Sequence, residues 1–153
     1  MARILLIDDT ASVLAALDYF LSNIGYDVVQ AGDGRTGLQR AAEVSPDLVM
    51  LDLEMPVMNG IAVCRTLKAD PRLGRIPVLM MTGQATQEAR RQALAAGAFV
   101  VMSKPFDLQV LEATVARGVA EGGGTVPAAV PGGIFGSGAE TAAGVGNAPP
   151  PAG

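Results

Sequence analysis

Residues 47–60 of this chain read Asp-Leu-Val-Met-Leu-Asp-Leu-Glu-Met-Pro-Val-Met-Asn-Gly, and this stretch decides the fold. Its apolar run, Leu48 to Leu51, ends at the carboxylate of Asp52, and the turn residues Pro56 and Asn59-Gly60 follow. The pattern predicts a buried strand that ends at Asp52, beside a loop. In an open α/β sheet, ligands bind at such a position.

Strand-like apolar runs alternate with helix-like segments on both sides of this stretch. Strands are expected over residues 3–7, 26–31, 47–52, 77–82 and 98–102. Helices are expected from a cap at Thr10 or Ser12 to Gly25, over residues 35–44, around Ile61, Cys64 and Leu67, over residues 86–96, and from Asp107 to about Val119. Five strands alternating with five helices predict an α/β fold with one parallel sheet covered on both faces. Right-handed crossovers then bring the C-terminal end of every strand to one edge.

The composition is that of one ordinary globular domain: 153 residues, half of them hydrophobic and 17% charged. The formal net charge is −4 and the Lys and Arg residues are scattered, which disfavours a nucleic-acid partner or an anionic membrane surface. The chain contains no His, so it has no imidazole metal site. Any phosphohistidine that it meets must therefore belong to another molecule.

No segment resembles a signal peptide, and no apolar run approaches the roughly 18 residues that a membrane span needs. Cys64 is the only cysteine, so the chain forms no internal disulfide. Its spacing from Ile61 and Leu67 predicts a buried, unreactive thiol on an apolar helix face. We expect a soluble protein in the cytoplasm.

The composition changes abruptly at Gly122. Residues 122–153 contain 10 of the 19 glycines, 5 of the 10 prolines and a single charged residue, Glu140. Such a sequence buries too little apolar area to offset its ordering entropy. We therefore expect one domain over residues 1–121 and a disordered tail or linker over residues 122–153, in which Ile134-Phe135 is the one candidate docking motif.

The predicted strands deliver three carboxylates, a hydroxyl and an ammonium group to one edge of the sheet, from Asp8, Asp9, Asp52, Thr82 and Lys104. Crowded carboxylates repel one another unless a cation lies among them, and an all-oxygen site of this kind suits Mg²⁺. Thr82 and Lys104 can each hold an oxygen of a phosphoryl group, which leaves Asp52 as the nucleophile that accepts it. Any one of these residues alone is more often a turn or cap residue. Their conjunction on four strand ends favours a chemical role.

These residues, in this order, resemble the response-regulator receiver domains of two-component signalling. The resemblance covers residues 2–120 in outline and rests on four motifs: Asp8-Asp9, the acceptor stretch from Asp52 to Gly60, Met81-Thr82-Gly83, and Lys104-Pro105-Phe106. It implies a doubly wound, flavodoxin-like sheet of strand order 2-1-3-4-5. The implied protein is a single-domain, chemotaxis-type receiver.

The resemblance also implies how the site works. Asp52 is phosphorylated from a phosphohistidine of a partner, either a sensor histidine kinase or a histidine phosphotransfer protein. Mg²⁺ is held by Asp9, Asp52 and the backbone carbonyl of Glu54, with Asp8 acting mostly through water. The protein would thus catalyse its own phosphorylation and slow dephosphorylation without being an enzyme in the usual sense.

Further implications of the resemblance concern the loops and the output. The Lys104-Pro105 bond would be cis, and Glu54 and Gln84 would adjust how fast the phosphoryl group is lost. We expect a stand-alone response regulator with no output domain in this chain. Its signal would be phosphorylation-dependent partner binding, or onward phosphotransfer, through the face built by the fourth helix, the fifth strand and the fifth helix.

The fifth strand departs from the family pattern. Receivers often carry Tyr or Phe three residues before the lysine, a switch aromatic that turns inward when the threonine moves toward the phosphoryl group. That position is Val101 here, which puts the aromatic switch in doubt. Phe99 and Val100 stand where polar residues are usual, so they pack in the core or form a partner-binding surface.

Three other functions stay open. The stretch Gly32-Asp-Gly34-Arg-Thr-Gly37 matches the dinucleotide-binding G-x-G-x-x-G pattern, but that assignment leaves Thr82 and Lys104 unexplained, and a turn and helix entry explain the glycines more simply. A phosphorylation-independent interaction module is the second, which Val101 keeps open. The third is a phosphatase with an Asp nucleophile, although the acid, spacer, acid order of such enzymes is absent after the first strand.

Overall fold

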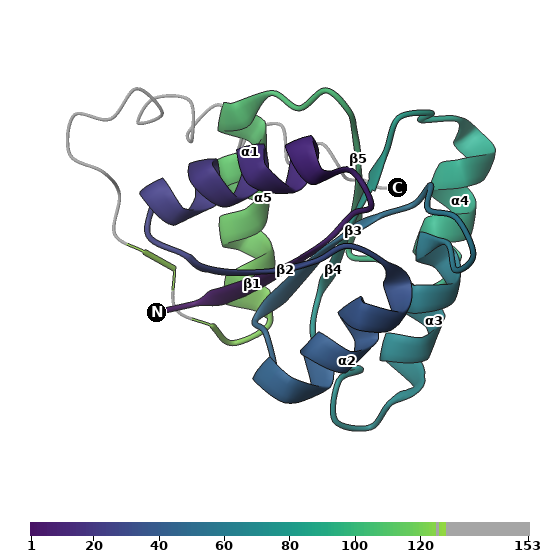
Figure 1. Cartoon of the computed structure of the whole chain (residues 1–153), viewed down its shortest axis with the longest axis horizontal. Helices are drawn as coiled ribbons and strands as arrows, with labels where there is room; N and C mark the ends of the chain where they lie inside the picture. Colours follow the sequence, from purple (N-terminus) through teal and green to yellow (C-terminus); the bar gives the residue numbers. More distant parts are fainter. Residues whose placement is uncertain (125, 128–153) are drawn as a thin grey trace.

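Five strands and five helices alternate through the described part of the chain, which the computed structural model gives as residues 1–124 and 126–127 (Figure 1). The strands are β1 (Arg3–Ile7), β2 (Asp27–Ala31), β3 (Leu48–Asp52), β4 (Val78–Thr82) and β5 (Val100–Ser103). The helices are α1 (Ala11–Asn23), α2 (Gly34–Val44), α3 (Gly60–Ala69), α4 (Gln87–Ala95) and α5 (Leu108–Glu121). The predicted alternation is confirmed.

The strands form one parallel sheet of order β2-β1-β3-β4-β5, as predicted. The order reverses between β1 and β3, so the crossover helices cover both faces of the sheet. Ile7 pairs with Leu51, and Asp52 pairs with Met81. This register places the residues that follow β1 beside the end of β3, and Thr82 beside them on β4. The predicted polar edge therefore exists as one continuous rim.

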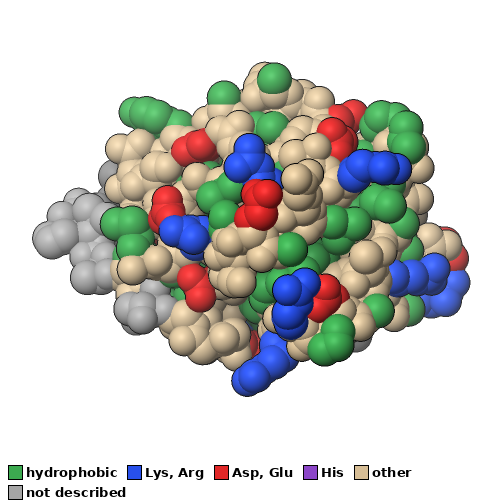
Figure 2. Space-filling model, turned by 60° about the horizontal axis from the view of Figure 1, so that its bottom comes forward, with side chains coloured by type: hydrophobic (Ala, Val, Ile, Leu, Met, Phe, Trp, Pro, Cys, Tyr) green, Lys and Arg blue, Asp and Glu red, His purple; other side chains and the backbone are tan. Residues whose placement is uncertain are grey.

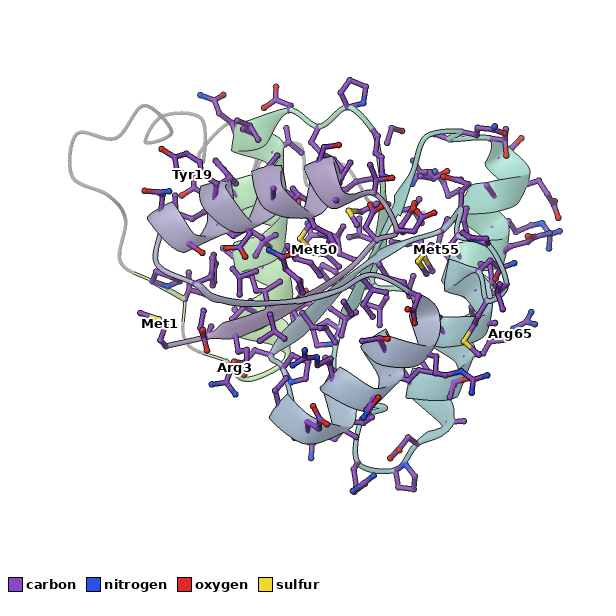
Figure 3. All side chains as sticks on the ribbon, in the orientation of Figure 1. Met1, Arg3, Tyr19, Met50, Met55 and Arg65 are labelled. Carbon is purple, nitrogen blue, oxygen red and sulfur yellow. The ribbon has the colours of Figure 1, made fainter. Side chains whose placement is uncertain are left out.

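Two apolar cores hold the sheet between its helices. On one face, the buried leucines of α1 and the buried Leu111, Val115 and Val119 of α5 pack against the sheet, and on the other face α2, α3 and α4 do so. Figure 3 labels Met50 in the first core and Met55 in the second. All five residues of β3 are buried, because a central parallel strand has helices on both sides.

The ends of α1 show how the chain enters and leaves the helix. Thr10 is the N-cap residue, but its side chain makes no capping hydrogen bond. Its backbone N–H instead donates to Asp8 Oδ1 at 2.9 Å, and Ser12 lies inside the helix. The predicted cap position at Thr10 is confirmed, but its hydroxyl forms no capping hydrogen bond. Gly25 follows the helix with φ of +105°, a left-handed conformation that glycine adopts without steric cost. The predicted stop is confirmed.

The connection from α4 to β5 differs from the predicted boundary. Gly97 has φ of +107°, and the Ala98 N–H donates back to the Ala93 carbonyl at 3.1 Å. The Ala98 N–H therefore still pairs with a carbonyl at the C-terminal end of α4, and the strand starts at Val100 rather than at residue 98. The inward face of α4 is alanine, whereas Leu94 is 38% exposed. Small side chains bury little apolar area, so α4 contributes little apolar burial to the core.

Cys64 is fully buried on α3, as predicted, and its Sγ donates to the Ala96 carbonyl at 3.4 Å. Burial raises the pKa of this thiol, which keeps it protonated and unreactive.

Charged side chains of both signs are interspersed on the face shown in Figure 2. None of the helices in the described residues has the length and apolarity that crossing a bilayer requires. The predicted tail, with Ile134-Phe135, lies outside the described residues apart from its first few positions.

Candidate functional site

Asp52 lies at the end of β3 and is 2% exposed. The strand pairs of β3 with β1 and β4 fix its backbone, and the Leu53 N–H donates to the Met81 carbonyl at 2.8 Å. Close packing also holds the loop behind it: a Cβ on Gly60 would lie 2.5 Å from the backbone oxygen of Asp52. Only glycine lets α3 begin so close to the strand end.

The acidic pair after β1 joins Asp52 in one cluster. Asp8 is fully buried and Asp9 is exposed, and one oxygen from each of the three carboxylates lies within 4.8 Å of the others. Both oxygens of Asp8 already accept hydrogen bonds, Oδ1 from Thr10 N and Oδ2 from Lys104 Nζ. A hard divalent cation such as Mg²⁺ fits this all-oxygen donor set, with Asp8 the least available for direct coordination.

Lys104 directly follows the C-terminal end of β5, and its side chain reaches the carboxylate cluster. Its Nζ lies 3.1 Å from Asp8 Oδ2 and 3.3 Å from Asp52 Oδ1, and its backbone N–H donates to the Thr82 carbonyl at 2.8 Å. The Lys104–Pro105 peptide bond is cis, as the resemblance implied. The structure thus brings together a cation and two buried carboxylates that are about a hundred residues apart at most in the sequence.

Burial sets the protonation of this cluster. Desolvation, followed by the negative charge of Asp8, raises the pKa of Asp52 to about 6, although Lys104 and the Glu54 N–H act in the opposite direction. Burial disfavours the charge on Lys104, but the hydrogen bond to Asp8 and the charges of both carboxylates raise the pKa of the ammonium above its ordinary value. Lys104 therefore stays charged. A further cation beside Asp52 would lower the pKa of its carboxyl and favour the ionised form.

Thr82 ends β4 and is fully buried. Its hydroxyl donates to Glu54 Oε2, and the neighbouring Gly83 N–H donates to Glu54 Oε1 at 3.0 Å. The Gln84 N–H donates to the hydroxyl oxygen at 3.0 Å. Glu54 and Gln84, which by the resemblance would adjust the loss of the phosphoryl group, therefore both contact Thr82. The sequence did not indicate the role of the Gly83 amide, because a backbone donor leaves no signal in residue type.

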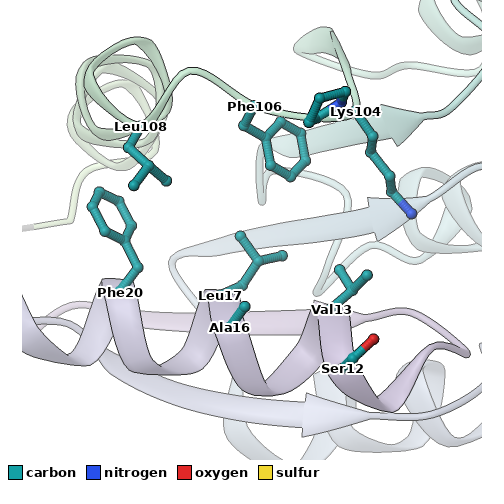
Figure 4. A pocket seen from close by; sticks show the side chains of 9 residues that line it. Ser12, Val13, Ala16, Leu17, Phe20, Lys104, Phe106 and Leu108 are labelled. Atoms are coloured by element: carbon teal, nitrogen blue, oxygen red, sulfur yellow. The ribbon is translucent and has the colours of Figure 1, made fainter.

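An apolar pocket of about 400 Å³ adjoins the site (Figure 4). One wall is α1 and the other is the segment from Lys104 to the start of α5; the lining residues are Ser12, Val13, Ala16, Leu17, Phe20, Lys104, Pro105, Phe106 and Leu108. Val13 and Phe20 of α1 pack against the core but stay partly exposed to this pocket. The sequence signal for this pocket was that α1 has more apolar residues than its contact with the core requires.

Val101, the atypical switch position, is 4% exposed and packs in the core beneath α4. Phe99 is partly buried against α5, where Arg117 stacks on its ring with the guanidinium carbon 5.1 Å from the ring centroid. Val100 is also partly buried. Phe99 and Val100 thus pack mainly within the domain.

The glycines of the G-x-G-x-x-G stretch lie in the turn after β2 and in the first turns of α2. A Cβ on Gly34 would lie 2.7 Å from Val63 Cγ2, and one on Gly37 would lie 2.5 Å from Ile7 Cδ1. The missing side chains at Gly34 and Gly37 let α2 pack closely against α3 and β1. These glycines serve helix entry and helix–sheet packing.

The fold and the rim define an open α/β protein with a cluster of carboxylates at the C-terminal edge of its sheet. Sequence comparison agrees with this class. The profile of the response regulator receiver domain matches residues 4–116. Over 115 residues the chain is 41% identical to the DNA-binding dual master transcriptional regulator RpaA of Synechocystis, a match that covers 75% of this chain and 48% of RpaA. It is also 41% identical to the response regulator PleD of Caulobacter vibrioides over 114 residues, 74% of this chain and 25% of PleD.

Solved structures show the same likeness. The chemotaxis protein CheY4 of Vibrio cholerae superimposes with a TM-score of 0.74 at 31% identity, covering 77% of this chain and 98% of CheY4. The receiver domain of the sensor histidine kinase PA1611 of Pseudomonas aeruginosa, with a magnesium ion coordinated in its active-site cleft, gives 0.73 at 27% identity, covering 78% of this chain and 98% of that domain.

The chain belongs to the response regulator receiver domain family. Receiver domains of this family serve phosphorylation-based signal transduction, in which they interact with histidine kinases or phosphotransfer proteins. The chain spans about half the length of RpaA, or less in the case of PleD.

Proposed function

We propose that Asp52 accepts a phosphoryl group from a phosphohistidine of a histidine kinase or phosphotransfer protein. An oxygen of the Asp52 carboxylate attacks phosphorus, the phosphorus–nitrogen bond breaks, and the imidazole leaves and takes up a proton. The products are an acyl phosphate on Asp52 and a neutral histidine on the donor. The chain itself has no His, so the donor is another molecule.

The observation that carries this proposal is the surroundings of Asp52. It is buried at the end of the central strand, between a carboxylate pair and the ammonium of Lys104 at 3.3 Å. A buried carboxylate with a raised pKa is poised for chemistry rather than for capping. Thr82 and Lys104 flank it with a hydroxyl and a cation that can each hold a phosphoryl oxygen.

Mg²⁺ would be held by Asp9, Asp52 and the main-chain carbonyl of Glu54, with Asp8 acting through water. The three clustered carboxylates support this assignment. The ion would offset negative charge on the incoming phosphoryl group. Lys104 balances the charge of Asp8, and Thr82 orients the phosphoryl oxygen that it holds.

The donor would cover the rim that carries Asp52. Lys104 belongs both to this rim and to the apolar pocket, so a carrier that places its histidine on Asp52 also lies over α1. We assign the pocket to that donor. Ala16→Arg should slow phosphotransfer from a protein donor at least tenfold while leaving phosphorylation by acetyl phosphate unchanged, because a small donor does not touch the pocket. Equal slowing of both reactions, or of neither, would contradict the assignment.

Output would pass through the face of α4, β5 and α5 in a cytoplasmic receiver over residues 1–121, by phosphorylation-dependent binding or onward transfer.

Binding of beryllofluoride in the presence of Mg²⁺, followed by fluorine NMR, tests the role of Asp52 as the phosphoacceptor. We expect bound fluorine resonances for wild type and none for Asp52→Asn. Absence of binding by wild type would favour a phosphorylation-independent module. Binding without amide shifts on that face would show that buried Val101 uncouples the site from it.

A further inference from the structure

Two donors hold the side chain of Glu54 at the end of β4. The Thr82 hydroxyl donates to Oε2, and the Gly83 N–H donates to Oε1 at 3.0 Å. A hydroxyl and an amide that converge on the two oxygens of one carboxylate form an anion cradle, named here the Thr82–Gly83 cradle. The Glu54 N–H also donates to Asp52 Oδ1 at 3.3 Å, which places the cradle next to the acceptor.

The hydroxyl proton of Thr82 is committed to this contact. The Gln84 N–H donates to Thr82 Oγ1 at 3.0 Å, so that oxygen already accepts a hydrogen bond. Its single proton has two acceptors in reach, the Glu54 carboxylate and the Gln84 carbonyl at 3.2 Å. The charged acceptor forms the stronger hydrogen bond. The cradle is therefore filled by an anion of the protein's own chain.

We propose that the Glu54 carboxylate is an intramolecular competitor of the phosphoryl group. It occupies the Thr82–Gly83 cradle before phosphorylation, and an incoming tetrahedral anion on Asp52 displaces it. This inference rests on the proposed role of Asp52 but concerns a separate group. One hydroxyl proton cannot serve both anions, and two negative charges that compete for the same donor repel each other. Glu54 is exposed, so the displaced carboxylate moves directly into water.

The competition has a measurable size. Removing the carboxylate frees two donors and removes one negative charge beside the bound anion. Removing a competitor that forms charge-assisted hydrogen bonds should strengthen beryllofluoride binding about tenfold. Glu54→Gln keeps an amide oxygen that accepts one hydrogen bond, so its gain should be smaller than that of Glu54→Ala. Both variants keep the main-chain carbonyl at position 54.

The experiment measures beryllofluoride affinity in Mg²⁺ by fluorine NMR for wild type, Glu54→Ala, Glu54→Gln and Glu43→Gln. Glu43 is an exposed carboxylate on α2 and serves as the matched control. The expected order of affinity is Glu54→Ala, then Glu54→Gln, then wild type equal to Glu43→Gln. Unchanged or weaker binding by Glu54→Ala, while wild type binds normally, would overturn the competition and leave the role of Asp52 intact.

A second readout needs no anion. In the free protein, loss of the carboxylate should shift the Gly83 amide resonance upfield and speed its hydrogen exchange, because this N–H loses its acceptor. An unchanged Gly83 amide in Glu54→Ala would show that the cradle is empty in solution and would overturn the inference. If no variant binds beryllofluoride although the Gly83 amide shifts, the acceptor role of Asp52 has failed, and the competition fails with it.

Discussion

Asp52→Asn is predicted to stabilise the metal-free protein, and to do so increasingly as the pH rises. Burial and the charge of Asp8 raise the pKa of Asp52 to about 6 in the folded state, against about 3.9 in an unfolded chain. Between these two values the folded state binds more protons than the unfolded state, so wild type loses stability as the pH rises through about 6. The asparagine does not titrate and avoids this loss.

The size of this stability change follows from the pKa shift of Asp52. About two pKa units correspond to about 3 kcal/mol in total, of which about 2 kcal/mol falls between pH 4.5 and pH 7.5. The change in unfolding free energy can be measured by urea unfolding in EDTA at both pH values. The proteins compared are wild type, Asp52→Asn and the surface control Glu43→Gln. The stability gap between Asp52→Asn and wild type should widen by about 2 kcal/mol over this range, and the control should follow wild type. Parallel curves for Asp52→Asn and wild type would refute the reasoning.

Further predictions concern backbone, packing and charge. Gly37→Ala should cost about 1–3 kcal/mol of unfolding free energy, because its Cβ would lie 2.5 Å from a buried isoleucine, whereas Gly32→Ala, with open space around it, should stay within about 0.5 kcal/mol; equal costs would contradict the packing role of Gly37. Val57 has φ of +69° and is fully exposed, so Val57→Asn should raise stability by about 1 kcal/mol in urea unfolding, and a loss would show that the side chain has a contact. Lys104→Met should cost roughly 2 kcal/mol in EDTA at pH 7.5, because two buried carboxylates lose their cation, and added Mg²⁺ should recover most of it; a cost unaffected by Mg²⁺ would argue against a metal among these carboxylates.

The fold was predictable from the sequence because each buried strand is a short apolar run between turn residues. The four apolar residues before Asp52 specify a strand covered on both faces, and the parallel topology then brings Asp8, Thr82 and Lys104 to its end. The cluster of carboxylates and lysine was predictable for the same reason: strand ends fix these positions almost independently of loop detail.

Other features depend on neighbours that local sequence does not identify. The Glu54 carboxylate reaches Thr82 and Gly83, 28 and 29 residues away, and the rotamer of an exposed glutamate is set by such partners rather than by its own spacing. The pocket beside α1 arises because the loop after Lys104 stands opposite a helix whose period shows only which residues share a face. The start of β5 was misplaced because the Ala98 N–H completes the preceding helix.

The central claim is that Asp52 is the phosphoacceptor, and locating the phosphoryl group tests it most directly. Wild type would be incubated with acetyl phosphate and Mg²⁺, reduced with borohydride to convert an acyl phosphate into an alcohol, and mapped by peptide mass spectrometry. We predict one phosphoryl increment on the intact protein and reduction at residue 52 alone, with neither in Asp52→Asn. An unmodified wild type, or a phosphoryl group at another residue that persists in Asp52→Asn, would contradict the claim.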